Sequence, residues 1–477
     1  MTLRKTKIVA TLGPSSSSEE MLARMITAGV NVVRLNFSHG SAEEHIRRAE
    51  IVRNIAAKLG RPVGVLCDLQ GPKIRIGKFE LGKITLKMGD IFILDADCEL
   101  GNQDHVGLDY KTLPQEVEEG VVLLLDDGRI TMQVDRVKGN QIHCVVLSGG
   151  VLSNNKGINR QGGGLSADAL TKKDREDIKT AVKLEADYIA MSFPKNALDV
   201  ELARTLVKKA GGNSSIVAKI ERAEAIENLE AIIEASDAIM VARGDLGVEV
   251  GDAAVPGLQK RMIRMARAQN KLVITATQMM ESMITSPIPT RAEVSDVANA
   301  VLDGTDAVML SAETAAGQYP LETVQAVHRV VMEAEKEYIN QYHAQKSDQV
   351  FMKTDEAVAA AAIYTAKHLK VKAIAALTQS GNAAQWLSRA DAEVPIYALS
   401  PDKFARRKLT LHRGVYPFPI EQGSKKRDEV LNEMEQVLLK EKAVSTGDLV
   451  LFTFGEPIGS PGGTNTLRIV KIGEQKN

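Results

Sequence analysis

The sequence predicts an α/β protein: a barrel of eight βα units, a small β domain inserted into it, and an open α/β domain after it. Eight short, continuously apolar runs alternate with segments of helical spacing. One long interruption after the third run has strand and turn signals but little helical periodicity. The chain has 477 residues, which suits two to four domains.

The barrel strands are predicted from the apolar runs. These runs are Lys7–Leu12, Val30–Leu35, Val63–Leu69, Tyr188–Phe193, Ile216–Ile220, Ala238–Ala242, Leu272–Thr277 and Ala307–Leu310. Continuous apolar strands that alternate with helices predict a parallel sheet covered on both faces. Eight such units close into a (β/α)8 TIM barrel, which we expect at residues 1–71 and 166–342. An open doubly wound sheet is the alternative.

The interruption at residues 72–165 predicts a small β-barrel domain. Lys83–Met88 and Val121–Leu125 read as strands bounded by turn residues. The two borders, Gln70-Gly71-Pro72 and Gln161-Gly162-Gly163-Gly164, are rich in glycine and proline. Glycines at both crossings suit a hinged lid.

A third domain is expected at residues 343–477. The polar stretch Gln345–Gln349 reads as a linker, and a helix near Glu356–Leu369 precedes a strand at Ala373–Leu377. Similar alternation continues through Leu449–Phe454 and Leu467–Val470. This pattern predicts an open α/β domain.

Composition excludes several classes of function. Lys plus Arg is 60 and Asp plus Glu is 61, and aromatic residues are 4% of the chain. Such a balance argues against nucleic acid as a partner. Apolar runs fall short of the ~20 residues of a membrane span. Three cysteines, without metal-ligand spacing, indicate a reducing compartment, so we expect a cytoplasmic protein.

Polar residues at the strand ends carry the predicted chemistry. Barrel enzymes place their sites at the carboxyl ends of the strands. Lys219 and Glu221 lie two apart on one run, so they face the same side. Asp245 and Thr277 end the next two runs. Two carboxylates with an ammonium beside them suit a divalent ion and an anionic, phosphorylated substrate.

Each of these four residues alone also has a structural reading, such as a helix cap, a turn or a buried ion pair. For all four at equivalent strand ends, coincidence is about one in ten. Arg34, Arg75, Arg243 and Lys156 are candidate phosphate-binding residues. Arg243 could instead be structural, paired with a carboxylate.

A second candidate site lies in the C-terminal domain. Its residues are Thr378, Ser380, Gly381 and Asn382, which follow one predicted strand and precede a helix. Hydroxyls and backbone amides at a helix start can bind phosphate, although an ordinary N-cap uses the same residues.

Longer motifs carry a resemblance to a known family. They are Asn31–Gly40 (NVVRLNFSHG), Lys219-Ile220-Glu221, Ala242–Glu249 (ARGDLGVE), Thr275–Met283 (TATQMMESM) and Pro289–Glu293 (PTRAE). In these the chain resembles the pyruvate kinases over essentially its whole length. The resemblance implies a lid domain, a C-terminal regulatory domain and a homotetramer. It also implies transfer of the phosphoryl group of phosphoenolpyruvate to ADP, giving pyruvate and ATP.

The resemblance implies a role for each matching residue. Glu221 and Asp245 would hold Mg²⁺, for which Mn²⁺ can substitute. The implied catalytic residues are Lys219, Thr277, Arg34 and Arg75, and the implied substrate-binding residues are Arg34, Lys219, Gly244, Asp245 and Thr277. The implied nucleotide-binding residues are Asn36, Phe37, Ser38, His39, Arg75 and Lys156.

The chain departs from the family at the K⁺ site. Asn36, Ser38, Asp68 and Leu69 occupy the positions that bind K⁺ in many relatives. Many K⁺-dependent relatives read Asp-Thr-Lys-Gly-Pro-Glu where this chain reads Asp68-Leu69-Gln70-Gly71-Pro72-Lys73. Lys73 could place its own ammonium near the K⁺ position, where a fixed cation repels a metal ion. We therefore expect reduced or absent K⁺ dependence.

The C-terminal loop also departs from part of the family. Relatives activated by fructose-1,6-bisphosphate often have a fuller Ser/Thr-rich loop, whereas Asn382-Ala383-Ala384 follows the glycine here. We therefore expect a phosphorylated effector such as a monophosphorylated sugar or AMP.

Two other functions remain as alternatives. One is a different metal-dependent barrel enzyme acting on phosphoenolpyruvate or a 2-oxo acid, such as a lyase or mutase, which the inserted domain and the Lys219/Glu221 pair disfavour. The other is an inactive paralogue that senses a metabolite. The complete set of Lys219, Glu221, Asp245 and Thr277 disfavours that reading.

Overall fold

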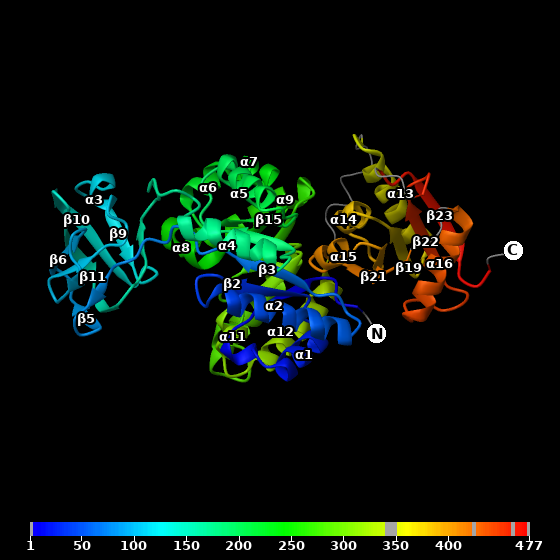
Figure 1. Ribbon diagram of the computed structural model, residues 1–477, viewed down its shortest axis with the longest axis horizontal. Coiled ribbons are helices and arrows are strands. Elements are labelled where there is room, and N and C mark those ends of the chain that lie inside the picture. The colour runs from blue at the N-terminus through cyan, green and yellow to red at the C-terminus, as the bar shows by residue number, and fades with distance from the viewer. Residues whose placement is uncertain (1–2, 339–350, 422–425, 459–462, 475–477) are drawn as a thin grey trace.

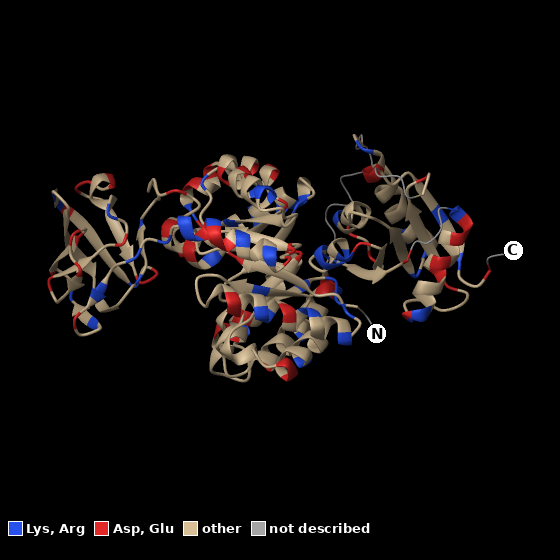
Figure 2. Cartoon of the chain, in the orientation of Figure 1, with Lys and Arg blue, Asp and Glu red and all other residues tan. Residues whose placement is uncertain are grey.

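Three domains lie in a row in the computed structural model (Figure 1). The structure describes residues 3–338, 351–421, 426–458 and 463–474. The inserted domain lies on the left of the view, the barrel in the centre and the C-terminal domain on the right. Each of the three carries acidic and basic residues (Figure 2), consistent with a net charge of -1.

The central domain is a closed barrel of eight parallel strands. The strands are β1 (Lys7–Thr11), β2 (Val32–Asn36), β3 (Gly64–Asp68), β14 (Tyr188–Met191), β15 (Ser215–Ile220), β16 (Ala238–Ala242), β17 (Leu272–Ala276) and β18 (Ala307–Leu310). Strand β1 pairs with β2 on one side and with β18 on the other. The predicted barrel is therefore confirmed, and the open doubly wound sheet is excluded.

Helices surround the barrel. They are α1 (Glu19–Ala28), α2 (Ala42–Lys58), α4 (Lys172–Lys183), α5 (Ala197–Lys209), α6 (Ala223–Glu227), α7 (Leu229–Ala235), α8 (Arg243–Val250), α9 (Val255–Ala268), α10 (Arg291–Leu302), α11 (Ala312–Ala315) and α12 (Pro320–Glu337). Their starts follow from local chemistry: Ser41, Thr171 and Thr290 each accept a hydrogen bond from the N3 amide in a capping box.

The inserted domain is built almost entirely of strands. They are β4 (Lys78–Phe79), β5 (Lys83–Leu86), β6 (Ile91–Asp95), β7 (Leu100–Gly101), β8 (His105–Gly107), β9 (Val122–Leu125), β10 (Ile130–Lys138), β11 (Gln141–Ser148), β12 (Gly150–Ser153) and β13 (Ile158–Arg160), with one short helix, α3 (Leu113–Glu116). Six of the strands form one sheet in the order β13-β9-β10-β11-β6-β8. The domain has its own apolar core, which includes Phe92, Leu123 and Met132.

The C-terminal domain is a five-stranded sheet in the order β21-β20-β19-β22-β23. Its elements are α13 (Thr354–Leu369), β19 (Ala373–Leu377), α14 (Asn382–Arg389), β20 (Ile396–Ser400), α15 (Lys403–Leu409), β21 (Val415–Pro419), α16 (Arg427–Lys440), β22 (Leu449–Phe454) and β23 (Thr466–Lys471). Only the β22–β23 pair is antiparallel among the paired strands of this sheet in the described residues. The predicted linker Gln345–Gln349 and the boundary at 342/343 lie outside the described residues.

A fourfold pattern of hydrogen bonds joins the strands at the amino-terminal rim of the barrel. A polar residue stands directly before every second barrel strand. These residues are Asn31 before β2, Asp187 before β14, Asp237 before β16 and Asp306 before β18. Each side chain accepts the backbone N–H of the strand before it: Ile8, Val65, Ile216 and Val273 donate at 3.0, 2.8, 2.7 and 2.8 Å. Each also accepts hydrogen bonds from arginine. Asn31 binds Arg4, Asp187 binds both Arg53 and Arg407, Asp237 binds Arg204, and Asp306 binds Arg389.

This rim is where the C-terminal domain docks. Arg389 reaches Asp306 and Arg407 reaches Asp187, both from the C-terminal domain. Tyr188, inside the barrel, donates to the Lys408 carbonyl at 2.6 Å, and Lys7 donates to the Val415 carbonyl at 2.6 Å. The carboxylates of Asp187 and Asp306 are fully buried. The two arginines of the C-terminal domain therefore help to neutralise carboxylates that are buried at this rim.

Among the described residues, no helix has both the length and the apolar character to cross a membrane.

Replacing Asp306 with alanine should lower the free energy of unfolding by about 3–5 kcal/mol, because buried Arg389 and the Val273 N–H would lose their partner. Urea denaturation followed by circular dichroism measures this. Glu333→Ala, which removes an exposed partner of Lys336, is the matched control and should change stability by less than about 1 kcal/mol. Equal effects of the two substitutions would contradict the assigned role of Asp306.

Candidate functional site

Four charged side chains meet at the carboxyl ends of neighbouring barrel strands. Arg34 lies in the middle of β2, Asp68 ends β3, and Lys219 and Glu221 lie at the end of β15 or directly after it. The Lys219 Nζ atom lies 2.9 Å from Glu221 Oε1 and 3.2 Å from Asp68 Oδ1. Arg34 contacts Asp68 Oδ2 at 2.7 Å through both Nε and a terminal nitrogen. The side chains of Asp68 and Glu221 are only 1% and 2% exposed.

Burial and pairing shift the pKa values in this cluster. Burial lowers the pKa of Lys219, but the Asp68 and Glu221 carboxylates outweigh it and raise that pKa above its ordinary value. Burial raises the pKa of Glu221 to about 7; Lys219 opposes the shift, whereas Asp245 adds to it. Glu221 is thus a carboxyl group whose negative charge is disfavoured without more positive charge nearby.

Glu221 and Asp245 are a suitable pair for a divalent ion. No group of three or more His, Cys, Asp or Glu side chains converges on a metal position among the described residues. Mg²⁺ needs only one or two carboxylates, because substrate oxygens and water complete its shell. The raised pKa of Glu221, caused by burial and by Asp245, indicates that a cation would be stabilised here.

The structure corrects the expected placement of Lys73. Its ammonium lies 2.9 Å from Asp245 Oδ1 and 3.6 Å from Asp127 Oδ1 of the inserted domain, rather than among the predicted K⁺ ligands. Residues 71–75 leave the barrel for the inserted domain, so the side chain meets carboxylates at that crossing. Burial lowers the Lys73 pKa, but Asp245 outweighs this and raises it.

Asp68, one of the predicted K⁺ ligands, has a carboxylate oxygen that can accept a further ligand. Its Oδ1 atom is buried and accepts no hydrogen bond of good geometry, although Lys219 Nζ lies nearby. The Asn36 Oδ1 atom accepts from the Ser38 amide at 3.1 Å, and the Leu69 carbonyl accepts from Ser192 Oγ at 2.7 Å. These oxygens are of the type that a hard cation prefers.

Thr277 is held in an unusual backbone conformation. Its φ angle is 67°, in the left-handed region that β-branched residues avoid. The Thr277 Oγ1 atom accepts from the Gly244 amide at 2.9 Å, at the start of α8. Strain of this kind is concentrated at functional sites.

Arg243 has the structural role that was the alternative to phosphate binding, because it pairs with a carboxylate. It donates to the Ala276 and Thr277 carbonyls at 3.1 and 2.6 Å and pairs with Asp296 at 2.7 Å. Arg243 therefore holds the end of β17 to α8 and α10 and is not free to bind phosphate.

The remaining predicted nucleotide-binding residues lie in two places, the inserted domain and the segment at the end of β2. In the inserted domain, Lys156 pairs with Asp126 at 2.6 Å and Arg75 donates to the Asn155 carbonyl at 3.0 Å. Phe37 is buried and stacks on His45 with ring centroids 4.3 Å apart. His39 is exposed on the loop after β2.

Ser192 was missed by sequence reasoning. Its Oγ atom accepts a hydrogen bond from Lys219 Nζ at 2.7 Å and donates to the Leu69 carbonyl. It stands at the end of the fourth apolar run, so the strand-end argument that singled out Lys219 applied to it equally.

The predicted effector residues form the turn between β19 and α14. Thr378 Oγ1 accepts from the Gly381 amide at 2.9 Å, and Asn382 Nδ2 donates to Asp355 at 2.6 Å. Gly381 has φ 95°, and Ser380 is exposed. Thr378 is thus occupied by an internal turn bond, whereas the Ser380 side chain faces solvent.

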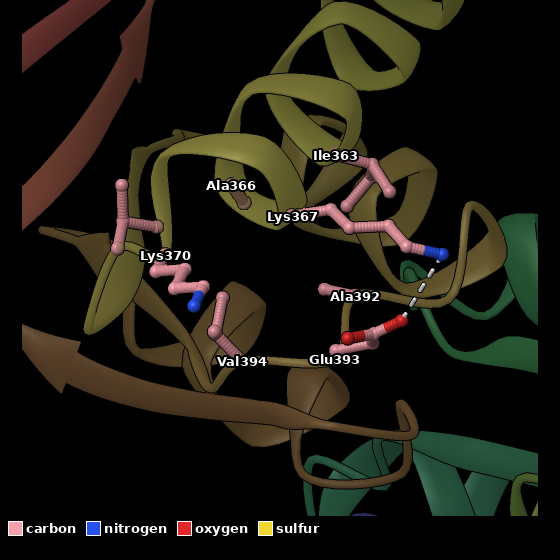
Figure 3. A pocket seen from close by; sticks show the side chains of 8 residues that line it. Ile363, Ala366, Lys367, Lys370, Ala392, Glu393 and Val394 are labelled. Atoms are coloured by element: carbon pink, nitrogen blue, oxygen red, sulfur yellow. Dashed lines mark ion pairs between the residues drawn. The ribbon is translucent and has the colours of Figure 1, made fainter.

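Two hollows lie away from these residues. One of about 180 Å³ lies at the end of α13, and two of its lining residues, Lys367 and Glu393, pair at 3.7 Å (Figure 3). The other, of about 1050 Å³, lies between the barrel and the C-terminal domain beside Lys7, Arg61 and Tyr416. None of the predicted site residues lines either hollow.

Comparison with known proteins identifies the family. Residues 3–324 match the family model described as "Pyruvate kinase, barrel domain", and residues 356–470 match "Pyruvate kinase, alpha/beta domain". The chain belongs to the pyruvate kinase family. It is 55% identical to "Pyruvate kinase" of Haemophilus influenzae, covering 95% of this chain and 96% of that one. It is 53% identical to "Pyruvate kinase II" of Salmonella typhimurium, covering 98% and 99%.

A third relative, "Pyruvate kinase" of Buchnera aphidicola, is 52% identical over 98% of this chain and 99% of its own. Membership of the pyruvate kinase family makes the chain a phosphotransferase. The expectation drawn from its motifs is therefore confirmed at the level of family and enzyme class.

Proposed function

We propose that this member of the pyruvate kinase family transfers the phosphoryl group of phosphoenolpyruvate to ADP, with Mg²⁺ as cofactor. The supporting observation is the buried Asp68–Lys219–Glu221 cluster at the carboxyl rim of the barrel, with Asp245 beside it. Phosphoryl transfer needs in-line positioning and neutralised charge rather than a covalent nucleophile. A cluster of fixed charges at one rim suits that need.

Each residue has a proposed role. Glu221 and Asp245 would hold Mg²⁺ or Mn²⁺, which supplies positive charge to the substrate oxygens. Lys219 stabilises negative charge on the transferring phosphoryl group and on the enolate that it leaves. Arg34 and Arg75 bind phosphoryl oxygens. Gly244 and the α8 amides receive the substrate carboxylate. Thr277, whose hydroxyl already accepts from Gly244, stands where the enolate methylene would gain its proton.

The lid supplies the nucleotide contacts in this proposal. Lys156 and Arg75 belong to the inserted domain, whereas Asn36 ends β2 and Phe37, Ser38 and His39 form the loop after it. Closing the inserted domain over the rim would bring the two groups together and exclude water. The test is pyruvate formation from phosphoenolpyruvate and ADP with Mg²⁺; a lyase or mutase would not require ADP, and a sensor would form no pyruvate.

The charge pairs at the rim bear on the need for K⁺. Arg34, Lys219 and Lys73 face Asp68, Glu221 and Asp245, and Lys73 also lies 3.6 Å from Asp127 of the inserted domain. Lys73 therefore contributes a fixed positive charge at this site even though it lies on Asp245. We propose that this built-in charge reduces or removes the need for K⁺.

We also propose a homotetramer in the cytoplasm. The family resemblance supports the assembly, and three scattered cysteines support a reducing compartment. Sedimentation velocity measures the assembly directly; a monomer at micromolar concentration would contradict it.

Lys219→Met should lower kcat by about a thousandfold or more, because a preorganised charge at the transferring group is lost. It should also lower thermal stability, since Asp68 and Glu221 lose a buried partner. Steady-state kinetics and calorimetry measure the two effects. Lys179→Met, which changes an exposed lysine on α4, is the control. Near-normal kcat in Lys219→Met would contradict its proposed role.

Lys73→Glu should create or strengthen a K⁺ requirement, because it replaces one positive charge beside Asp245 by a negative one. Activity is measured with Mg²⁺ in K⁺-free buffer and then with added KCl. The unmodified enzyme should be active in both buffers. An identical salt response of the two proteins would rule the idea out.

We propose that a phosphorylated effector, a sugar monophosphate or AMP, binds at Thr378, Ser380, Gly381 and Asn382. The supporting observation is the exposed Ser380 beside the start of α14. Ser380→Asp should abolish activation by either ligand through charge repulsion while sparing basal activity. Activation that survives in Ser380→Asp would place the effector elsewhere.

A further inference from the structure

The inserted domain joins the barrel through two crossings, and both contact the segments that carry the proposed metal ligands. We define the exit crossing as residues 159–165, which lead from β13 back to the barrel. The entry crossing is residues 71–75, which lead out from β3. The entry crossing places Lys73 2.9 Å from Asp245, near the start of α8.

The exit crossing contacts the other end of α8. Glu249, the second-last residue of that helix, is 8% exposed. Its Oε1 atom accepts a hydrogen bond from Asn159 Nδ2 of β13 at 3.3 Å. Its backbone carbonyl accepts the Gly162 amide, also at 3.3 Å. A single residue of the barrel thus contacts the exit crossing through both its side chain and its backbone.

The same carboxylate also reaches the turn that follows Glu221. The Glu249 Oε2 atom accepts the Ala223 amide at 3.0 Å. Ala223 is two residues after Glu221 and begins α6. One buried carboxylate therefore joins three segments: the exit crossing, the end of α8, and the turn after the strand that carries Lys219 and Glu221.

Neighbouring residues of that turn strengthen the connection. Arg222 donates to the Leu165 carbonyl at 3.3 Å, and Glu224 accepts the Gly164 amide. Gly163 has φ 78°, and a Cβ atom there would lie 2.5 Å from Glu224 Oε2. The backbone of the exit crossing therefore lies directly against the residues that follow Glu221, and the positive φ angle at position 163 favours glycine there.

We propose that Glu249 is a positioning residue that couples the orientation of the inserted domain to the position of Glu221. The inference rests on the proposed function, because it assumes that Glu221 holds the divalent ion. A divalent ion bound to Glu221 would restrain the turn at Ala223. Because Glu249 is hydrogen-bonded to Ala223, Asn159 and Gly162, the exit crossing would be restrained as well. Lys73 joins the other crossing to Asp245, so α8 is held at both ends by the crossings.

Metal-induced protection of the exit crossing tests this coupling without any turnover. Hydrogen–deuterium exchange of residues 159–165 is measured in the full-length protein with and without Mn²⁺, and Mn²⁺ affinity is measured by calorimetry. In the unmodified protein Mn²⁺ should slow exchange at Gly162 and Gly164. In Asn159→Ala this protection should be lost or reduced by about two- to tenfold, the effect of one hydrogen bond, while Mn²⁺ affinity is retained.

A second variant distinguishes coupling from stability alone. Glu249→Gln keeps the size of the side chain but turns one acceptor oxygen into a donor. It should reduce both the protection and the Mn²⁺ affinity, and raise the KM for ADP more than it lowers kcat. Asn140→Ala, an exposed residue of the inserted domain, and Glu227→Gln, exposed on α6, are the matched controls.

The outcomes separate the two proposals. Protection that persists in both Asn159→Ala and Glu249→Gln would overturn the role of Glu249 and leave the reaction intact. A fall in thermal stability with unchanged protection and Mn²⁺ affinity would likewise overturn it. Absence of pyruvate formation in the unmodified protein, with Mn²⁺ protection present, would instead overturn the proposed reaction.

Discussion

The pairing of β1 with β18 is the constraint on which the rest of the structure depends. It closes eight parallel strands into a ring, so all their carboxyl ends meet at one rim and all their amino ends at the other. Arg34, Asp68, Lys219 and Asp245 come from four different strands or the residues after them, and only closure brings them together. The opposite rim becomes a docking surface for the same reason.

The two rims bury charge in different ways. At the amino rim, Asn31 and three aspartates accept a backbone N–H and an arginine each, so their hydrogen-bonding capacity is used within the fold. At the carboxyl rim, the pKa of Glu221 stays raised, and Asp68 Oδ1 has Lys219 nearby but accepts no hydrogen bond of good geometry. Incomplete satisfaction of buried groups costs stability. Under the proposed function, a cation and an anionic substrate would supply the partners that these buried groups lack.

Helix α8 links this rim to the inserted domain. Its first residues carry Gly244 and Asp245, and its end carries Glu249. Both crossings of the inserted domain contact it, one through Lys73 and one through Asn159. Helix α8 has eight residues, about two turns, and its backbone hydrogen bonds lie along its axis, so a displacement of one end is passed to the other. The position of the inserted domain and the geometry of the rim are therefore coupled in our proposal.

The sequence by itself determined the strands, the helix caps and the residues at the strand ends, because these follow from local periodicity and short-range hydrogen bonding. It also predicted three domains and placed Lys219, Glu221 and Thr277 at one rim. Only the tertiary structure decided that the sheet closes, that Lys73 pairs with Asp245, and that Ser192 and Glu249 join the site. Those contacts link residues distant in sequence, and which carboxylate an ammonium meets depends on how the chain crosses between domains.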